Sequence, residues 1–430
     1  MPSHAVLSLT PEEQAALQAA LASASPALQR RARIIALSAE GASVASIVAA
    51  VGLSERQVRR WQKRFQERRA AIFAAPEAGE KTAPEPRRAK QRRKDSSSGQ
   101  SPDAEQPRLP LRLDKKPGIS QDDPMSETGR KVLYFHFERM LLHEPGSRLG
   151  EDIEAVHDMR VATRRMRSAL RVFAPYFRPG AIRPFQRALR DTARALGAVR
   201  DMDVFIDRLQ RYRASLPPEA DDSLSPLLDY CATERETARA RLIDHLNSPA
   251  FAGFVEAFAA FLTTPGAGAR PIDPETPVAH QTGHLAPRLI YTRYEAVRAY
   301  EPVLACATID TLHALRIEFK RLRYTLEFFE EILGSEVALV IDEVKAMQDH
   351  LGDLNDAQVA GLYLQNFIAQ HEKAQAALPI SERRSIEQVV NYLAYQFAEK
   401  HRLMSLFPAA WERFNRVEVR QALALAVAVL

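Results

Sequence analysis

The sequence has few cysteines, no long apolar run and no apolar leader, and each absence excludes a class of protein. Two cysteines in 430 residues, Cys231 and Cys306, are too few for a disulfide framework or a thiolate metal site, which fits a reducing compartment. No stretch reaches the roughly 18 apolar residues that span a bilayer, and the apolar tail at 421–430 is too short. The first residues lack the basic and apolar regions of a secretory signal. We therefore expect a soluble, cytoplasmic protein with no membrane partner.

Acidic and basic residues are nearly balanced. The chain has 59 Lys plus Arg against 54 Asp plus Glu, for a net charge of +5. Its length, with 46% hydrophobic residues, allows two or three folded units with substantial cores. Because the total charge is small, the function must depend on where the cations cluster.

Residues 1–75 have the helix starts and stops of a small helical unit. Thr10 is followed by proline and two glutamates, which is typical of a capped helix start. A second helix is expected from about 26 to 40, a third begins after Ser43, and a fourth begins after Ser54, beyond a glycine turn. A short helix, a glycine turn and a capped basic helix predict a helix-turn-helix domain at 1–75.

The fourth of these helices carries an apolar face of Val58, Trp61 and Phe65. Its other faces hold side chains suited to phosphates and to base edges in a DNA groove. These candidate DNA-binding residues are Arg56, Gln57, Arg59, Arg60 and Lys63. The segment resembles the helix-turn-helix of transposases and homeodomain-like bacterial regulators. The alternative is a helical bundle that has lost DNA binding and serves as a docking module.

Residues 76–125 are rich in Pro, Ser, Gly, Lys and Arg and nearly free of apolar residues. Such a composition cannot bury enough surface to offset the entropy of ordering, so it predicts a disordered linker. The basic run at 87–94 either binds polyanions or only keeps the tether soluble.

Residues 126–430 show helical periodicity throughout, and their central feature is a repeated basic segment. Segment 157–171 returns 156 positions later as 313–324, and both copies start with His followed by cations at +3, +7, +8 and +10. Two more pairs of segments keep the same order: 131–134 with 288–291, and 196–201 with 351–356. The repeat predicts an all-α fold of two pseudo-symmetric antiparallel four-helix bundles, at 126–265 and 280–430.

The repeated segments place cations three and four positions apart, on one face of a helix. Like charges this close destabilise an isolated helix, so a ligand is expected. Arginine binds phosphate oxygens bidentately, and lysine adds a point charge. If the two halves face each other, the stripes converge on a basic groove that suits an extended, regularly charged polyanion. The candidate residues are Lys131, His157, Arg160, Arg164, Arg167, Arg171, Arg190, Arg194, Arg288, Arg293, His313, Arg316, Lys320, Arg323 and Lys345.

Two paired motifs make residues 126–430 similar to the CHAD family, the conserved histidine α-helical domain. They are the His-x-x-Arg-x-x-x-(Arg/Lys)-Arg-x-Arg segments that begin at His157 and His313, and the Leu-Gly-x-x-x-Asp segments that begin at Leu196 and Leu351. The resemblance implies two pseudo-symmetric helical bundles around a basic cavity lined by the candidate residues. It also implies binding of inorganic polyphosphate and association with polyphosphate granules. Many CHAD proteins also carry a CYTH triphosphatase domain, whose charged strands this sequence lacks.

Several residues next to the basic stripes have other expected roles. Asp201 and Asp356 should cap a helix or orient cavity arginines, because bare carboxylates would repel an anionic ligand. Arg165 and Arg321 should pair with acids between helices.

The leading hypothesis is a non-catalytic polyphosphate-binding protein, located in the cytoplasm on polyphosphate granules or the nucleoid, which links granules to DNA through its N-terminal domain. An alternative is a DNA-binding transcription regulator with a polyanion-sensing domain. A second alternative is a metal- or phosphate-handling enzyme that uses the repeated histidines. No His-x-x-x-His motif or paired-carboxylate site accompanies them, so we expect no metal and no cofactor. The sequence leaves open both the oligomeric state and the preference for polyphosphate over nucleic acid.

Overall fold

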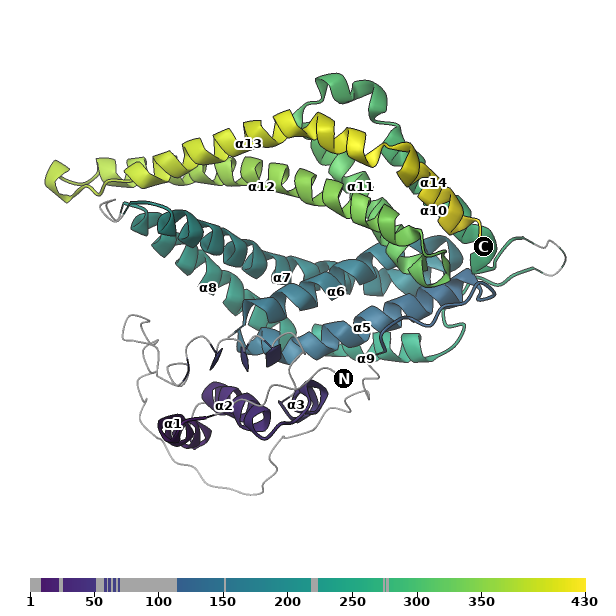
Figure 1. Cartoon of the computed structure of the whole chain (residues 1–430), viewed down its shortest axis with the longest axis horizontal. Coiled ribbons are helices and arrows are strands. Elements are labelled where there is room, and N and C mark those ends of the chain that lie inside the picture. Colours follow the sequence, from purple (N-terminus) through teal and green to yellow (C-terminus); the bar gives the residue numbers. More distant parts are fainter. Residues whose placement is uncertain are drawn as a thin grey trace, which may run out of the picture. The chain divides into compact units, whose positions relative to one another are not determined.

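The structure is a computed structural model that describes residues 9–22, 26–51, 58–59, 61–62, 65–66, 69, 114–150, 152–217, 223–273, 275 and 278–430. The chain divides into two compact units, Met1–Arg112 and Leu113–Leu430. Regular structure in the described residues is helical (Figure 1), and pairing of extended backbone is limited there to two isolated bridges. The all-α prediction is therefore confirmed.

The first three expected helices of the N-terminal unit begin where the sequence predicts. They are α1 (Pro11–Leu21), α2 (Pro26–Ala39) and α3 (Val44–Val51). The expected start of the fourth helix lies outside the described residues. Thr10 and Glu13 form a reciprocal capping box, in which each side chain accepts a hydrogen bond from the other's backbone N–H. The Ser43 hydroxyl accepts a hydrogen bond of 3.1 Å from the Ser46 N–H at the start of α3.

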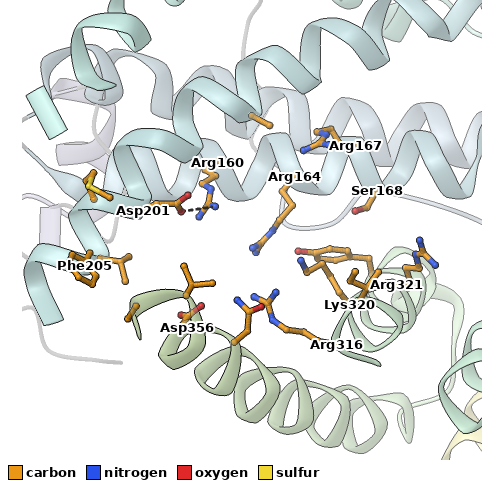
Figure 2. Close-up of a pocket in the computed structure, with 18 of the residues that line it drawn as sticks. Arg160, Arg164, Arg167, Ser168, Asp201, Phe205, Arg316, Lys320, Arg321 and Asp356 are labelled. Carbon is orange, nitrogen blue, oxygen red and sulfur yellow. Dashed lines mark ion pairs between the residues drawn. The ribbon is translucent and has the colours of Figure 1, made fainter. Parts of the chain in front are cut away.

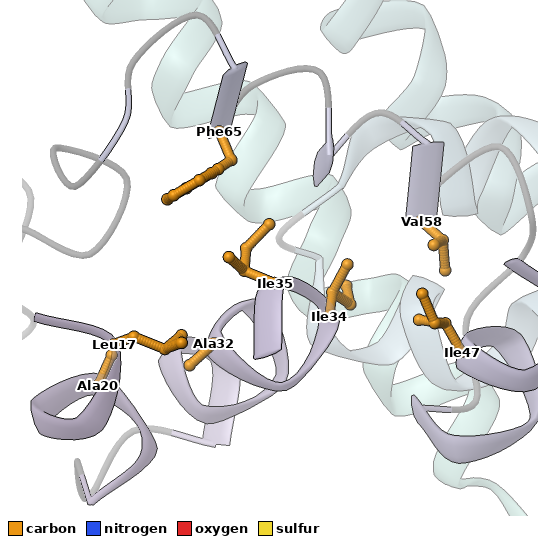
Figure 3. Close-up of a cluster of buried hydrophobic side chains, with 8 residues drawn as sticks. All are labelled: Leu17, Ala20, Ala32, Ile34, Ile35, Ile47, Val58 and Phe65. Carbon is orange, nitrogen blue, oxygen red and sulfur yellow. The ribbon is translucent and has the colours of Figure 1, made fainter. Parts of the chain in front are cut away.

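The core of this unit joins α2 and α3 to the last expected helix, whose described residues between 58 and 66 are helical. Val58 and Phe65 are fully buried together with Ile34, Ile35 and Ile47 (Figure 3). The apolar face predicted for the last helix therefore faces the core in its described residues.

The larger unit consists of two halves that repeat the same order of helices. In the described residues the first half contains α5 (Met125–Leu149), α6 (Ile153–Val172), α7 (Pro179–Ala214), α8 (Ser225–Asn247) and α9 (Pro249–Thr263). The second contains α10 (Thr282–Arg298), α11 (Ile309–Phe329), α12 (Val337–Ala376), α13 (Glu387–Phe414) and α14 (Val417–Val427). The first four helices of each half pack in sequence, each against the next. The repeated segments occupy matching helices, α6 and α11, and a shorter fifth helix closes each half.

An ionic cluster joins the halves where α6 meets α11. The nearly buried carboxylate of Glu327 lies 2.9 Å from Arg165 Nη2 of α6 and 2.7 Å from Arg323 Nε of its own helix. The expectation that Arg165 pairs between helices is confirmed. For Arg321 it is wrong, because this side chain pairs with Glu318 one turn earlier on α11.

A second contact joins the far ends of the halves. An apolar cluster combines Leu209 of α7 and Leu227 of α8 with Leu364 of α12 and Tyr392 of α13. The halves therefore meet beside the repeated basic helices and again at the far ends of the long helices. The starts of α5 and α10 are also joined, by a hydrogen bond between the hydroxyls of Thr128 and Thr282.

The last residues of the expected linker differ from that expectation. The backbone N–H groups of Gly118 and Ile119 donate to the Glu331 carboxylate at 2.9 and 3.1 Å, and the Ile119 side chain is buried. An apolar side chain and satisfied backbone donors thus hold residues 114–124 on the helical unit. Residues 76–113 lie outside the described residues. No helix in the described ranges is long and apolar enough to cross a membrane.

Candidate anion-binding cavity

A cavity of about 730 Å³ lies between α6 and α7 of the first half and α11 and α12 of the second. Figure 2 shows cationic side chains that enter it from both sides, with Arg164 of α6 opposite Arg316 and Lys320 of α11. The cations in its lining are Arg160, Arg164, Arg167, Arg171, Arg208, Arg316, Lys320 and Arg321. The acids in its lining are Asp201 and Asp356. The cavity therefore carries a large excess of positive charge.

Helix α6 presents its basic stripe to this cavity because its other face is apolar. Met159, Met166 and Leu170 are buried on that face, at spacings of seven and four residues, which place them on one side of a helix. The Asp152 carboxylate caps the helix by accepting a 3.0 Å hydrogen bond from the Glu154 N–H. Burial of the apolar face thus fixes the rotation of α6 and directs the arginines into the cavity.

The glycine of each Leu-Gly-x-x-x-Asp segment lies against one arginine of the facing helix. A Cβ on Gly197 would lie 3.8 Å from Arg160 Nε, and a Cβ on Gly352 would lie 4.0 Å from Arg316 Nε. Each arginine therefore lies against its glycine, where a longer side chain would fill the same space. The two contacts are pseudo-equivalent, since each joins a glycine of one repeated motif to an arginine of the other.

Both carboxylates of the lining pair with arginines. Asp201 Oδ1 lies 3.0 Å from Arg160 Nη2 within the first half, whereas Asp356 Oδ2 lies 2.8 Å from Arg208 Nη2 across the cavity. Burial raises the pKa of Asp201, and the charge of Asp356 adds to this effect while Arg160 opposes it. The expectation that these acids orient cavity arginines is confirmed, although the second pair breaks the pseudo-symmetry.

Two arginines that face each other lack a hydrogen-bond partner for a buried donor. The Nε atoms of Arg164 and Arg316 are buried and bond to no protein atom. The Arg164 guanidinium also lies 5.8 Å from the ring centroid of the buried Tyr324, within range of a cation–π contact. Burial lowers the pKa of Arg164. Leaving a buried donor without a partner costs free energy. These N–H groups are therefore suited to donate hydrogen bonds to an anionic ligand.

Among the cations of the lining, Lys320 has the most strongly lowered pKa. Burial lowers the pKa of its amine to about 8, and repulsion from Arg316 and Arg164 contributes. In the described part of the helical unit, no carboxylate lies within ion-pair distance of this amine. Burial and the surrounding arginines thus disfavour the charged form of Lys320 in the ligand-free cavity.

Some candidate residues lie outside the lining because other groups hold them. Lys131 Nζ is 2.7 Å from Asp123, and Arg323 pairs with Glu327. The His313 ring Nδ1 lies 2.7 Å from the amide oxygen of Asn355, which does line the cavity. His157 is half-buried, and burial, with the charge of Arg200 added, lowers its pKa.

The remaining candidates lie around the cavity rather than in its lining. Arg190 and Arg194 are exposed on α7, close enough to Arg167 to add to the effect of burial and of Arg171 in lowering its pKa. Arg293 of α10 acts similarly on Arg171. The last two are Arg288, whose charge opposes the burial-induced rise in the pKa of Tyr176, and Lys345, which is exposed on α12.

Arg208 and Arg321 line the cavity although neither was expected there; Arg321 was expected to pair with an acid between helices. Arg208 aligns in the repeat with Tyr363, and both residues line the cavity. The repeat therefore carried no signal for this cation.

Of the candidate DNA-binding residues, Arg59 is described, and its side chain is exposed on a helical segment. Arg56, Gln57, Arg60 and Lys63 lie outside the described residues.

Comparison with known proteins gives matches to both parts of the chain. The profile of the CHAD domain matches residues 131–365, and that of the homeodomain-like domain matches residues 25–73. Uncharacterized proteins from two strains of Mycobacterium tuberculosis are each 27% identical over 253 residues, covering 56% of this chain and 45% of the relative. The chain thus spans less than half the length of the curated relatives that it matches.

Two solved structures are also similar. The crystal structure of the CHAD domain from the plant Ricinus communis superposes with a TM-score of 0.53 at 25% identity, covering 68% of this chain and 93% of that chain. PptA from Streptomyces chartreusis gives a TM-score of 0.47 at 16% identity, over 67% of this chain and 100% of that chain.

Proposed function

The chain belongs to the CHAD domain family, and from this premise we propose that its helical unit binds inorganic polyphosphate in the cavity between the two halves. The observation that carries the proposal is the pair of facing arginines, Arg164 and Arg316, whose buried Nε donors have no protein partner. Phosphate oxygens accept hydrogen bonds from guanidinium groups in the geometry that these donors need.

The dimensions of the cavity favour a thin polyanion. Its volume of about 730 Å³ falls within the range of a small-ligand pocket. A nucleic-acid duplex is too large for this cavity, because the whole duplex is wider than its major groove, which alone measures about 12 Å. The cations of α6 recur about every 5.4 Å, one helical turn, which matches a ligand whose charge repeats along its length. A sugar-free phosphate chain meets both conditions.

The test compares two double variants that remove the same charge. Arg164→Ala with Arg316→Ala removes the two unpartnered donors that face each other across the cavity. Arg211→Ala with Arg402→Ala removes two arginines outside the lining, which pair with Asp207 and Glu399. Binding of labelled long-chain polyphosphate is measured by fluorescence anisotropy between 50 and 200 mM salt, a span of roughly fourfold over which phosphate contacts weaken.

We expect the cavity variant to bind at least about 150-fold more weakly, because it loses two charge-assisted hydrogen bonds at roughly 1.5 kcal/mol or more each. Its plot of log affinity against log salt should lose about 1.4 units of slope, 0.7 for each lost single-strand phosphate contact. The control variant should bind within about twofold of the wild type, since exposed ion pairs contribute little. Equal affinities of the two double variants would refute the cavity as the binding site.

Binding is proposed to be non-catalytic. Incubation of the full-length protein with polyphosphate and divalent metal ions should release no orthophosphate. If orthophosphate appears, the enzyme alternative gains support, and His157→Asn with His313→Asn then tests whether the repeated histidines are responsible.

The N-terminal unit is proposed to bind DNA and so to link polyphosphate granules to the nucleoid in the cytoplasm. The match of residues 25–73 to the homeodomain-like domain supports this part. Competition of long-chain polyphosphate against DNA on the full-length protein separates the possibilities. Independent sites leave DNA bound at saturating polyphosphate, whereas a regulator that senses polyanions should change its footprint on a defined DNA sequence.

A further inference from the structure

Lys320 differs from the other cations of the cavity because its amine can lose its proton near neutral pH. The amine projects from α11 toward the stripe of α6, and the charges that lower its pKa belong to Arg316 on its own helix and to Arg164, Arg160 and Arg171 opposite. The neighbouring helices offer no compensation. Asp201 of α7 is held by Arg160, and Asp356 of α12 is held by Arg208.

We propose that Lys320 is a nucleophilic lysine, and that the arginines around it direct its acylation by small acyl phosphates. Such a molecule carries a phosphate for guanidinium groups to bind and an acyl carbon next to that phosphate. A phosphate held by Arg164 and Arg316 places the acyl carbon beside the amine, because these residues and Lys320 face the same space. The cavity thus provides both proximity and a free nucleophile.

The reaction needs no further reagent. The neutral amine nitrogen of Lys320 attacks the acyl carbon, and a C–N bond forms. The C–O bond of the mixed anhydride breaks, and orthophosphate leaves with the electron pair. The proton that the nitrogen loses passes to phosphate or solvent. The products are an amide on Lys320 and free phosphate, and nothing is oxidised or reduced.

A larger fraction of the Lys320 amine is neutral, and so able to attack the acyl carbon, than for an ordinary lysine. Because burial and the nearby arginines lower its pKa from 10.5 to about 8, the neutral fraction of the amine at pH 7.5 is roughly 200-fold larger. A bound phosphate dianion restores part of the proton affinity. The four nearby arginines outnumber its two charges, so the amine stays in a positive field.

Acylation would also remove one positive charge from the cavity. If polyphosphate binds there, which rests on the proposed function, an acylated chain should bind it more weakly. Bound polyphosphate should in turn protect Lys320 by occupying the arginines.

The test is acetylation of the full-length protein by acetyl phosphate, with labelled sites quantified by peptide mass spectrometry between pH 6.5 and 10. Lys345 serves as the matched control, since it is exposed on α12 outside the lining. At pH 7.5 we expect Lys320 to react at least about tenfold faster than Lys345, from the larger neutral fraction after allowance for partial burial. Its rate should level off above pH 8.

A neutral acetylating ester, N-hydroxysuccinimidyl acetate, measures amine reactivity without anion recognition. The preference for Lys320 over Lys345 should be at least several-fold larger with acetyl phosphate than with this ester. Arg316→Ala should shrink that difference and move the midpoint for Lys320 to higher pH. Lys320→Arg should abolish the label, and its circular dichroism should show that the chain still folds.

Equal rates at Lys320 and Lys345 with acetyl phosphate would overturn the proposal, as would an equal preference with both reagents. The outcome is separable from that of the proposed function. Selective acetylation in a protein that binds no polyphosphate refutes the proposed function alone. Polyphosphate binding without selective acetylation refutes this inference alone.

Discussion

Replacing Lys320 by methionine should stabilise the ligand-free protein at neutral pH. The side chain is unbranched and similar in size, so methionine can occupy the same space beside α6. The substitution removes a partly buried cation that burial and four arginines make unfavourable. Lys320 thus adds a positive charge to the cavity and lowers the stability of the ligand-free protein.

The size of the effect follows from the displaced pKa. A fall from 10.5 to about 8 corresponds to about 3 kcal/mol of unfavourable free energy for the charged form in the folded state. Below pH 8 the lysine is protonated in both states, so this full cost opposes folding. Between pH 8 and 10.5 the unfolded chain binds a proton that the native chain has released, and the stability of the wild type therefore rises with pH. Above that range the cost disappears.

The assay is urea unfolding of the helical unit in the full-length protein, without ligand, at pH 7 and pH 10. The Lys320→Met variant should be more stable than the wild type at pH 7, and its advantage should shrink by about 2 to 3 kcal/mol at pH 10. Any change in packing adds the same offset at both values and cancels in the comparison. Lys345→Met, at an exposed position of α12, is the control and should show no such pH dependence. An advantage that stays constant with pH would contradict the reasoning.

Three further predictions concern the joint, the cavity and the N-terminal unit. Glu327→Gln removes the charge that holds guanidinium groups of α6 and α11 together, and it should destabilise the helical unit by about 2 kcal/mol in urea unfolding. The control Glu399→Gln, whose partly exposed side chain pairs with Arg402 of the same helix, should cost less than about 0.5 kcal/mol. Asp356→Asn frees Arg208 and should tighten polyphosphate binding about fivefold in anisotropy titrations; weaker binding would count against an electrostatic site. Arg59→Ala should lower DNA affinity in gel-shift assays by a similar factor for every sequence if the contact is to phosphate. It should leave polyphosphate affinity unchanged, and a parallel loss of both would show that the two sites are not independent.

The helices and the basic stripes could be predicted from sequence because they depend on local spacing. The arginines at 160, 164, 167 and 171 share one side of α6, since a helix turns through the same angle at each residue. The buried residues Met159 and Met166 share the other side, so the direction of the stripe relative to the core was also encoded locally. The repeat added the second wall of the cavity, because pseudo-equivalent segments occupy equivalent helices.

The pairing of charges was decided by the tertiary structure. Lys131 and Arg323 carry the same charge as the residues of the lining, yet carboxylates from the residue 114–124 segment and from α11 hold them elsewhere. Arg208 enters the cavity because α7 brings it opposite Asp356 of the other half. Such pairs join residues far apart in sequence, and their formation depends on the rotation and offset of packed helices, which residue spacing does not specify. The sequence alone therefore determined the kind of site, whereas helix packing determined which cations remain available to a ligand.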